Sequence, residues 1–255
     1  MKMDSEIEQY RTPERLSRRI SIHERYSVNR QGFGNWIYEH YQIRPGQKIL
    51  ELGCGDGSMW QPHISELPER TTLLLTDLSP GMLASAEEKL RGTENISFQV
   101  VDIQEIPCED DSFDLVIANM MLYHVPQIEK ALREVSRVLK PGGKACFATY
   151  GENGILTHLD RMLPGLRLWE KSNRRFTLQN GMPILRRVFE DVQLLRYDDA
   201  LAVTEVEDIV DYLYTLDSMV ELRTRSRAEL TERLRACQMN GVLHIPKEYG
   251  IFICR

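Results

Sequence analysis

The sequence predicts an α/β fold, with an open parallel sheet and helices on both of its faces. Segments with strand character alternate with segments of helical spacing between residues 48 and 150, which is the pattern of repeated strand–helix–strand units. Residues 113–119, FDLVIAN, are almost wholly apolar, as expected of a strand that helices cover on both faces. Residues 48–57, KILELGCGDG, run from an apolar strand into a glycine-rich turn.

Five strands are expected in this region, each a short apolar or β-branched run bounded by turn residues. The first follows Pro45-Gly46, a dipeptide typical of turns. The connections between parallel strands of one sheet are expected to be right-handed. The predicted strands cover residues 48–52, 71–77, 96–102, 113–119 and 144–150.

Helices are expected between these strands. Residues 58–67 have helical character, although Pro62 limits that helix. The next helix covers residues 81–90, with Ser79 as its cap and Pro80 at its first position. Residues 127–139, QIEKALREVSRVL, predict an amphipathic helix.

The alternating pattern stops after residue 150, and helical segments then predominate. Thr204 and Glu207 have the spacing of a capping box before the helix of residues 206–216. We expect the added helices to form a lid rather than a second domain. Further helices are expected over residues 4–26, 154–175, 180–190 and 221–240, and strands over residues 192–203 and 249–255.

Composition narrows the class of protein. The 255 residues suit one α/β domain, and 42% hydrophobic and 27% charged residues are ordinary for a globular protein. The sequence has neither a membrane-spanning apolar run nor the apolar centre of a signal peptide, so we expect a cytoplasmic protein. Five cysteines without CxxC spacing, and scattered histidines, predict no disulfide framework and no metal site.

A net charge of −6 disfavours nucleic acid as a partner, and the sequence does not indicate the oligomeric state.

Polar or flexible residues stand at the end of each predicted strand. Ligands of open parallel sheets bind outside the carboxyl ends of the strands. We therefore expect one site at this edge, formed by Gly53–Gly57, Asp77, Asp102, Asn119 and Tyr150.

The residue types at this edge favour an adenosine ligand without phosphate. The turn has GxGxG spacing, with Ser58 where a dinucleotide fingerprint has its third glycine, and Asp56 is expected to disfavour a pyrophosphate. The Asp77 carboxylate can accept hydrogen bonds from two ribose hydroxyls. The Asp102 carboxylate and the Ile103 backbone N–H can bind the edge of an adenine.

Four segments carry a family resemblance, and together they span about residues 47–150. They are ILELGCGDG, LLLTDLSPGML, VVDIQEIPCEDDSFDLVIANMMLYHV and LREVSRVLKPGG. As a set they resemble the class I S-adenosylmethionine-dependent methyltransferases that act on small molecules. The resemblance implies a Rossmann-like, doubly wound sheet of seven strands whose last strand, YGIFICR, is antiparallel, with S-adenosylmethionine as cofactor and S-adenosylhomocysteine as product.

The resemblance also implies roles for individual residues. Asp77 would bind the ribose and Asp102 the adenine amine, while Asn119 would offer its backbone carbonyl to the methionine amine. Tyr26 and Trp36, in HERYSVNRQGFGNW, would close over the cofactor. The full expected cofactor site comprises Tyr26, Trp36, Glu51, Gly53, Cys54, Gly55, Gly57, Asp77, Leu78, Met82, Asp102, Ile103, Asn119 and Met120.

Methyl transfer is an in-line displacement, so much of the rate comes from alignment, and a base is needed only if the acceptor must lose a proton. His124 is the candidate base, because it closely follows the fourth strand. Tyr123 and Tyr150 are candidates for binding the acceptor. His158, Trp169, Arg174 and Phe176 lie in the region where relatives of this kind build acceptor pockets.

The expected organisation is one methyltransferase domain over residues 1–255. It comprises an N-terminal helical cover (1–45), a cofactor-binding core (46–150) and helical insertions near the acceptor site (151–190 and 204–240). The acceptor is expected to be a small molecule, methylated on oxygen, nitrogen or carbon. The alternatives are an RNA or protein methyltransferase, a binding protein without catalysis, and a nicotinamide dehydrogenase, which Ser58 and Asp56 disfavour.

Overall fold

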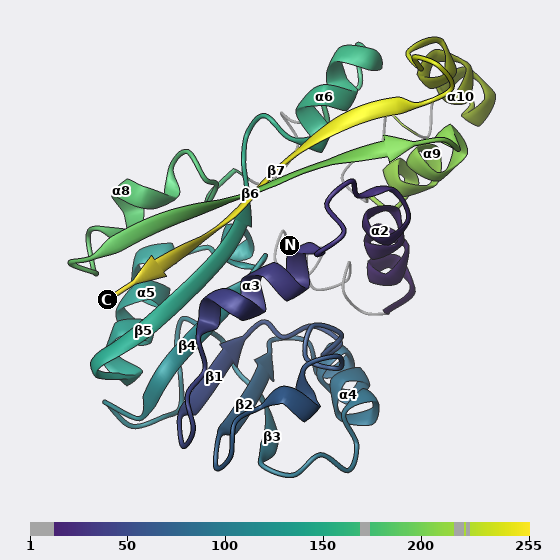
Figure 1. Cartoon of the computed structure of the whole chain (residues 1–255). Helices are drawn as coiled ribbons and strands as arrows, with labels where there is room; N and C mark the ends of the chain where they lie inside the picture. The colour runs from purple at the N-terminus through teal and green to yellow at the C-terminus, as the bar shows by residue number, and fades with distance from the viewer. Residues whose placement is uncertain (1–12, 169–173, 217–221, 223–224) are drawn as a thin grey trace.

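The computed structural model describes residues 13–168, 174–216, 222 and 225–255 (Figure 1). Its centre is a seven-stranded sheet with the strand order β3-β2-β1-β4-β5-β7-β6. The strands are β1 (Lys48–Leu52), β2 (Thr72–Asp77), β3 (Ile96–Val100), β4 (Phe113–Asn119), β5 (Leu139–Tyr150), β6 (Val192–Val203) and β7 (Leu243–Cys254).

The predicted fold class is confirmed. Strands β1 to β5 pair in parallel, and β7 lies antiparallel to both β5 and β6. The expected last strand, residues 249–255, is longer at its start, because β7 already pairs with β6 from Leu243. Strand β5 also begins earlier than residue 144: Leu139 pairs with Phe113, and the register then shifts before Lys144 pairs with Leu115.

The helices follow the predictions less closely. The α-helices are α2 (Pro13–Tyr26), α3 (Phe33–Tyr41), α4 (Pro80–Lys89), α5 (Ile128–Val138), α6 (Ile155–Met162), α8 (Gly181–Leu185), α9 (Val206–Tyr214) and α10 (Arg227–Ala236). Two short 3-10 helices are η1 (Ile64–Glu66) and η2 (Leu122–His124). Residues 4–12 of the expected N-terminal helices, and Trp169, lie outside the described residues.

Two helix predictions are wrong. Residues 58–67 form turns and η1 rather than an α-helix, in keeping with the breaker Pro62. The capping box is absent, because α9 begins after Glu205 and no side chain caps it. The Thr204 hydroxyl instead hydrogen-bonds with Tyr26 of α2. A tertiary contact has therefore replaced a local one.

Helices cover both faces of the sheet. One apolar cluster joins β4 and β5 to α5 and α8, and a second joins β1 and β2 to α3 and α4. A third cluster joins α2, α6, α9 and α10 to the distal halves of β6 and β7. Because Tyr150, the last residue of β5, pairs with Tyr249, residues 198–203 and 243–248 lie beyond β5 and pair with each other. This two-stranded ribbon extends past the carboxyl end of β5 and carries the third cluster (Figure 1).

The N-terminal cap of α4 gives a stability prediction. The Ser79 hydroxyl accepts a hydrogen bond from the Met82 backbone N–H at 3.3 Å, as the sequence predicts. Ser79→Ala should lower the free energy of unfolding by about 1 kcal/mol, measured by urea denaturation. Ser85→Ala is the matched control, because the Ser85 hydroxyl bonds only to the Gly81 carbonyl of the same helix among its described hydrogen bonds. Equal losses in the two variants would contradict the assigned cap.

Candidate active site at the carboxyl ends of the strands

The glycine turn is held against the end of β2. The backbone N–H groups of Gly53 and Cys54 both donate to the Thr76 carbonyl, at 2.8 Å each. Gly53 adopts φ of 75°, and a Cβ atom there would lie 2.9 Å from Cγ of Met121. A side chain at residue 53 is therefore excluded both by the backbone conformation and by its neighbour.

Asp77 ties this turn to the start of α4. One carboxylate oxygen accepts from the Gly55 backbone N–H at 2.9 Å, and the other from the Ser79 backbone N–H at 2.8 Å. Burial raises the pKa of Asp77, and these backbone donors oppose that rise. Each oxygen keeps further acceptor capacity, so the carboxylate can still accept hydrogen bonds from a ligand.

The negative charge of Asp56 is balanced by a neighbouring lysine. It therefore does not disfavour a pyrophosphate in the way that the sequence suggested. Its carboxylate lies 2.5 Å from the Lys89 ammonium and also accepts from the Ser58 hydroxyl at 2.8 Å. Burial favours the neutral form, but Lys89 and Ser58 lower the pKa of Asp56 overall. A different feature makes the turn unsuited to a pyrophosphate: residues after Gly57 form turns, so no helix N-terminus begins there.

A buried hydrogen-bond network connects β1, β4 and α3. One oxygen of Glu51 accepts from the Trp60 indole N–H, and the other accepts from the Asn119 amide N–H at 3.0 Å. The same Asn119 amide nitrogen donates to the Tyr41 hydroxyl at 2.7 Å. Burial raises the pKa of Glu51 to about 7, against the opposing effect of its two donors. Glu51 thus lies beneath the site and orients Asn119.

Sequence reasoning missed Tyr41 and Trp60. Both side chains are fully buried, and their rings stack on each other with centroids 6.2 Å apart. Nothing in their local spacing marks them, because the network joins residues that are far apart in the chain. The aromatic-rich segment before residue 41 was the available signal.

This network leaves the side-chain oxygen of Asn119 without a hydrogen bond. Because the Asn119 amide nitrogen donates to both Tyr41 and Glu51, its side-chain oxygen faces the other way, buried and without a hydrogen-bond partner among the described residues. The next residue, Met120, adopts the left-handed conformation with φ of 51°, which is unusual outside glycine. A ligand ammonium group at this strand end would satisfy the Asn119 oxygen, so the residues fit an amino-acid moiety.

The remaining expected adenosine residues differ in exposure. Leu78 is 46% exposed, which leaves an apolar surface beside Asp77. Asp102 is half-buried and accepts hydrogen bonds from the backbone and side chain of Gln104, while Ile103 is buried. Met82 is fully buried in this structure and presents no side-chain surface to a ligand.

Tyr26 and Trp36 lie on the N-terminal elements but contact the ribbon side of the molecule. The Tyr26 hydroxyl donates to the Asp208 carboxylate of α9 at 2.5 Å. The Trp36 ring packs against Tyr197 of β6 and against His40. The predicted closure of these two side chains over a cofactor remains a prediction.

The residues predicted to bind the acceptor, Tyr123 and Tyr150, belong to a row of neighbouring aromatic side chains. The Tyr123 ring contacts His124 and Tyr150, with centroids 4.5 and 4.8 Å apart. Tyr150 pairs across the strands with Tyr249, whose hydroxyl lies 3.4 Å from Nε2 of His23. Burial and the charge of Lys247 lower the pKa of His23 to about 3, so this imidazole is neutral.

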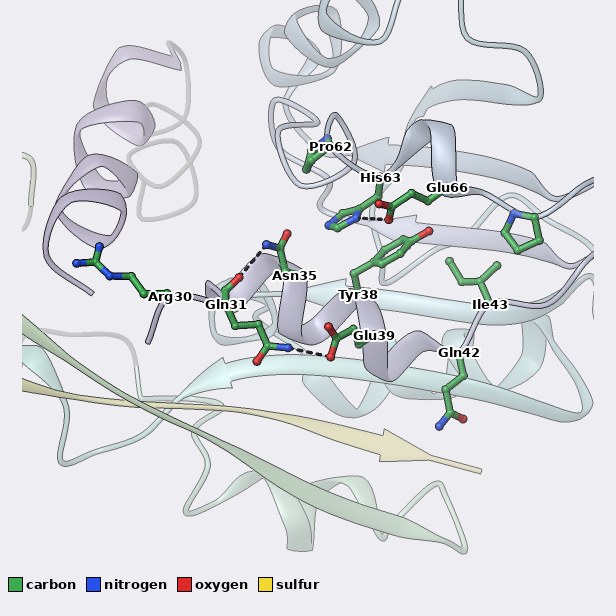
Figure 2. A pocket seen from close by; sticks show the side chains of 11 residues that line it. Arg30, Gln31, Asn35, Tyr38, Glu39, Gln42, Ile43, Pro62, His63 and Glu66 are labelled. Carbon is green, nitrogen blue, oxygen red and sulfur yellow. Dashed lines mark hydrogen bonds and ion pairs between the residues drawn. The ribbon is translucent and has the colours of Figure 1, made fainter. Parts of the chain in front are cut away.

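A separate cavity of about 660 Å³ lies between α3 and residues 62–68, and Figure 2 shows the side chains that line it. Its lining includes Asn35, Tyr38 and His63, and none of the predicted site residues. Among residues 13–168, 174–216, 222 and 225–255, no group of three potential metal ligands comes together. In the same residues, no helix is both long and apolar enough to cross a membrane.

Comparison with known proteins agrees with this geometry. The family model of a methyltransferase domain matches residues 50–147, which run from β1 through β5. In structure, the chain is similar to YcgJ from Bacillus subtilis, with a TM-score of 0.62 and 17% identity over 86% of this chain and 96% of that one. At that identity, the likeness shows the fold.

Two curated relatives are similar in sequence. The ubiquinone/menaquinone biosynthesis C-methyltransferase UbiE of Vibrio vulnificus is 36% identical over 104 residues, 40% of each chain. The methyltransferase GfsG of Streptomyces halstedii is 32% identical over 127 residues, which cover 47% of this chain and 44% of GfsG. The match thus spans less than half the length of either relative. Residues 50–147 thus match a methyltransferase domain, and in sequence and strand order the chain is similar to the class I S-adenosylmethionine-dependent methyltransferases, which take their methyl group from S-adenosylmethionine.

Proposed function

We propose that this protein transfers a methyl group from S-adenosylmethionine to an uncharged small molecule that carries an aromatic or similarly flat ring. The observation that supports this most is the buried, unpartnered oxygen of Asn119, which lies at the end of β4. The chain continues from Asn119 through Met121 into η2, where the Tyr123 ring contacts Tyr150. Donor and acceptor sites are thus adjacent in the chain.

The cofactor would lie along the ends of β1, β2 and β4. Asn119, supported by Glu51, would accept from its amine, Asp77 would accept from its ribose hydroxyls, and Asp102 with Ile103 would bind the adenine edge. Gly53, Cys54, Gly55, Gly57, Leu78 and Met120 would form the walls. When bound, the cofactor supplies a methyl group on a positively charged sulfur, which is already a good leaving group.

The acceptor would bind on the β5 side. Tyr123 and Tyr150 present rings and hydroxyls, and the neighbouring His23 is neutral. The buried charges nearby, Lys247 and Asp199, compensate each other. Such a lining favours an uncharged ring compound over an ionic one. The name of the UbiE relative, a quinone-biosynthesis C-methyltransferase, supports the same class.

We expect the segments of the chain to have the separate roles that the sequence suggests. Residues 46–150 would hold the cofactor, residues 1–45 would cover it, and residues 151–190 and 204–240 would bound the acceptor. The third apolar cluster supports this division, because it packs α2 against helices from both insertions. His124, in η2 after β4, would take a proton where the acceptor must lose one.

Cofactor binding tests the role of Asp77. Asp77→Asn keeps the shape of the side chain but replaces an acceptor oxygen with a donor, so the affinity for S-adenosylhomocysteine in calorimetry should fall by about tenfold or more. Alanine is a poorer choice, because Asp77 also supports the turn and α4. Asp114→Asn is the control, since Asp114 lies at the start of β4 and bonds to Lys48 and Lys140. Equal affinities in wild type and Asp77→Asn would exclude this role.

The raised pKa of Glu51 predicts a pH dependence. In the free protein, Glu51 carries a proton below about pH 7. A cationic amine at Asn119 favours the ionised carboxylate, so affinity for S-adenosylhomocysteine should rise between pH 5.5 and 7.5, by up to about tenfold per pH unit below 7. Glu51→Gln should flatten this dependence. A wild-type affinity that is constant across this range would contradict the coupling.

Turnover tests the enzyme itself. Labelled S-adenosylmethionine and a fractionated metabolite extract should yield a labelled, uncharged ring compound. On that acceptor, His124→Gln should lower kcat by about 100-fold if proton removal is required, with the affinity for S-adenosylhomocysteine unchanged. Unchanged turnover would remove His124 from the mechanism, and label on RNA or protein alone would contradict the small-molecule assignment.

A further inference from the structure

A buried ion pair interrupts an otherwise apolar face of the ribbon. Asp199 of β6 and Lys247 of β7 are paired in register, their charged groups lie 2.5 Å apart, and their side chains are 0% and 1% exposed. On one side of them the same face carries Leu201 and Ile245, which belong to the third cluster. On the other side it carries Ile251 of the cluster beneath α3.

The connection between α2 and α3 crosses the ribbon at this pair. The Ser27 hydroxyl donates to Asp199 at 2.8 Å and accepts from Lys247 at 2.9 Å. The Asn29 backbone N–H donates to the other Asp199 oxygen at 3.0 Å. The Val28 backbone N–H donates to the Ala200 carbonyl at 2.9 Å, so this connection also pairs with β6. The ion pair thus hydrogen-bonds with the Ser27 hydroxyl and the Asn29 backbone N–H of the crossing segment.

The same segment fixes the start of α3. The Phe33 ring packs against Tyr197 and Tyr249, with centroids 5.3 and 5.1 Å away. The Lys247 ammonium lies 5.0 Å from the centre of the Tyr249 ring, which adds a cation–π contact. The ion pair and the first turn of α3 therefore make neighbouring contacts on β6 and β7.

The other end of α3 reaches the candidate cofactor site. Its last residue, Tyr41, accepts the hydrogen bond from the Asn119 amide, and the Lys144 ammonium of β5 donates to the Tyr41 carbonyl at 2.5 Å. Besides its packing in the second apolar cluster, helix α3 is therefore attached to β6 and β7 at its first end and to the end of β4 at its last. A displacement of its first end would change how Tyr41 orients Asn119.

We propose that Asp199 and Lys247 are positioning residues for the cofactor site, which act through residues 27–29, α3 and Tyr41. The proposal rests on the proposed binding of the cofactor amine at Asn119. It assigns a role in cofactor affinity to two residues of the last two strands, more than 75 positions from Asn119 in the chain.

The test replaces the whole pair, because removing one charge would leave the other buried alone and destabilise the fold. Asp199→Leu combined with Lys247→Met gives an apolar pair of similar size, which such sites often accept without loss of stability. The variant keeps the ribbon packed but cannot bond to Ser27 or Asn29. Two measurements apply: calorimetry with S-adenosylhomocysteine, and hydrogen exchange of the Asn29 amide and the α3 amides.

The proposal predicts that the double variant folds, with the wild-type melting temperature or a higher one, and that the amides of Asn29 and α3 exchange faster. Binding of S-adenosylhomocysteine should be about tenfold weaker, which is the loss expected if α3 is correctly placed about a tenth of the time. Ser27→Ala should change affinity in the same direction by a smaller factor. Arg196→Gln is the control, because Arg196 is exposed and its ion pair with Glu248 joins the same strands on their other face.

Wild-type affinity in a folded double variant would overturn the proposal and leave the proposed function standing. If the double variant does not fold, Ser27→Ala decides, and unchanged affinity and unchanged Asn29 exchange in that variant would overturn the proposal. A wild-type protein that does not bind S-adenosylhomocysteine would overturn the proposed function itself, and this proposal with it.

Discussion

The buried carboxylate of Glu51 is the constraint on which the site depends. It lies at the end of β1, enclosed by Trp60 and Asn119, and its two oxygens each accept one hydrogen bond. Buried polar groups must be paired, so this carboxylate fixes which way the Asn119 amide faces. The amide oxygen is then directed away from Glu51 and left without a hydrogen-bond partner among the described residues. The proposed site for the cofactor amine therefore depends on the orientation of an amide and not on an exposed acidic side chain.

The sheet topology brings this network together with the rest of the site. Parallel pairing of β1, β2 and β4 places Leu52, Asp77 and Asn119 at one edge, although they are far apart in the chain. The antiparallel β6 and β7 then continue past the end of β5 as the ribbon, which carries α2, α9 and α10 (Figure 1). The same framework therefore supports the edge that would hold the cofactor and, beside it, the helices that would bound the acceptor.

Local signals sufficed for the features that local chemistry determines. The apolar runs gave β1 and β4 at the bounds that the structure shows, and Ser79-Pro80 gave the start of α4. The argument that the charge of Asp56 disfavours a phosphate was wrong, because Lys89, which lies 33 residues away in the chain, neutralises that charge. The capping box predicted at Thr204 was wrong for a similar reason, because the Thr204 hydroxyl bonds to Tyr26 and not to its own helix.

The residues that sequence reasoning missed act through long-range contacts. Tyr41 meets Asn119 across 78 positions, and Ser27 meets Asp199 across 172. No periodicity or motif encodes such pairs, which exist only after α3 packs across the sheet and the ribbon. A buried Asp and Lys on neighbouring strands look like ordinary charged surface residues until the register of β6 and β7 is known.

A crystal structure of the complex with S-adenosylhomocysteine tests the central claim most directly. The account predicts that the ligand amine lies within about 3.2 Å of the Asn119 side-chain oxygen, while the Asn119 amide nitrogen keeps its bonds to Glu51 and Tyr41. A complex in which the amine binds elsewhere, with that oxygen still unpartnered or the amide reversed, would contradict it.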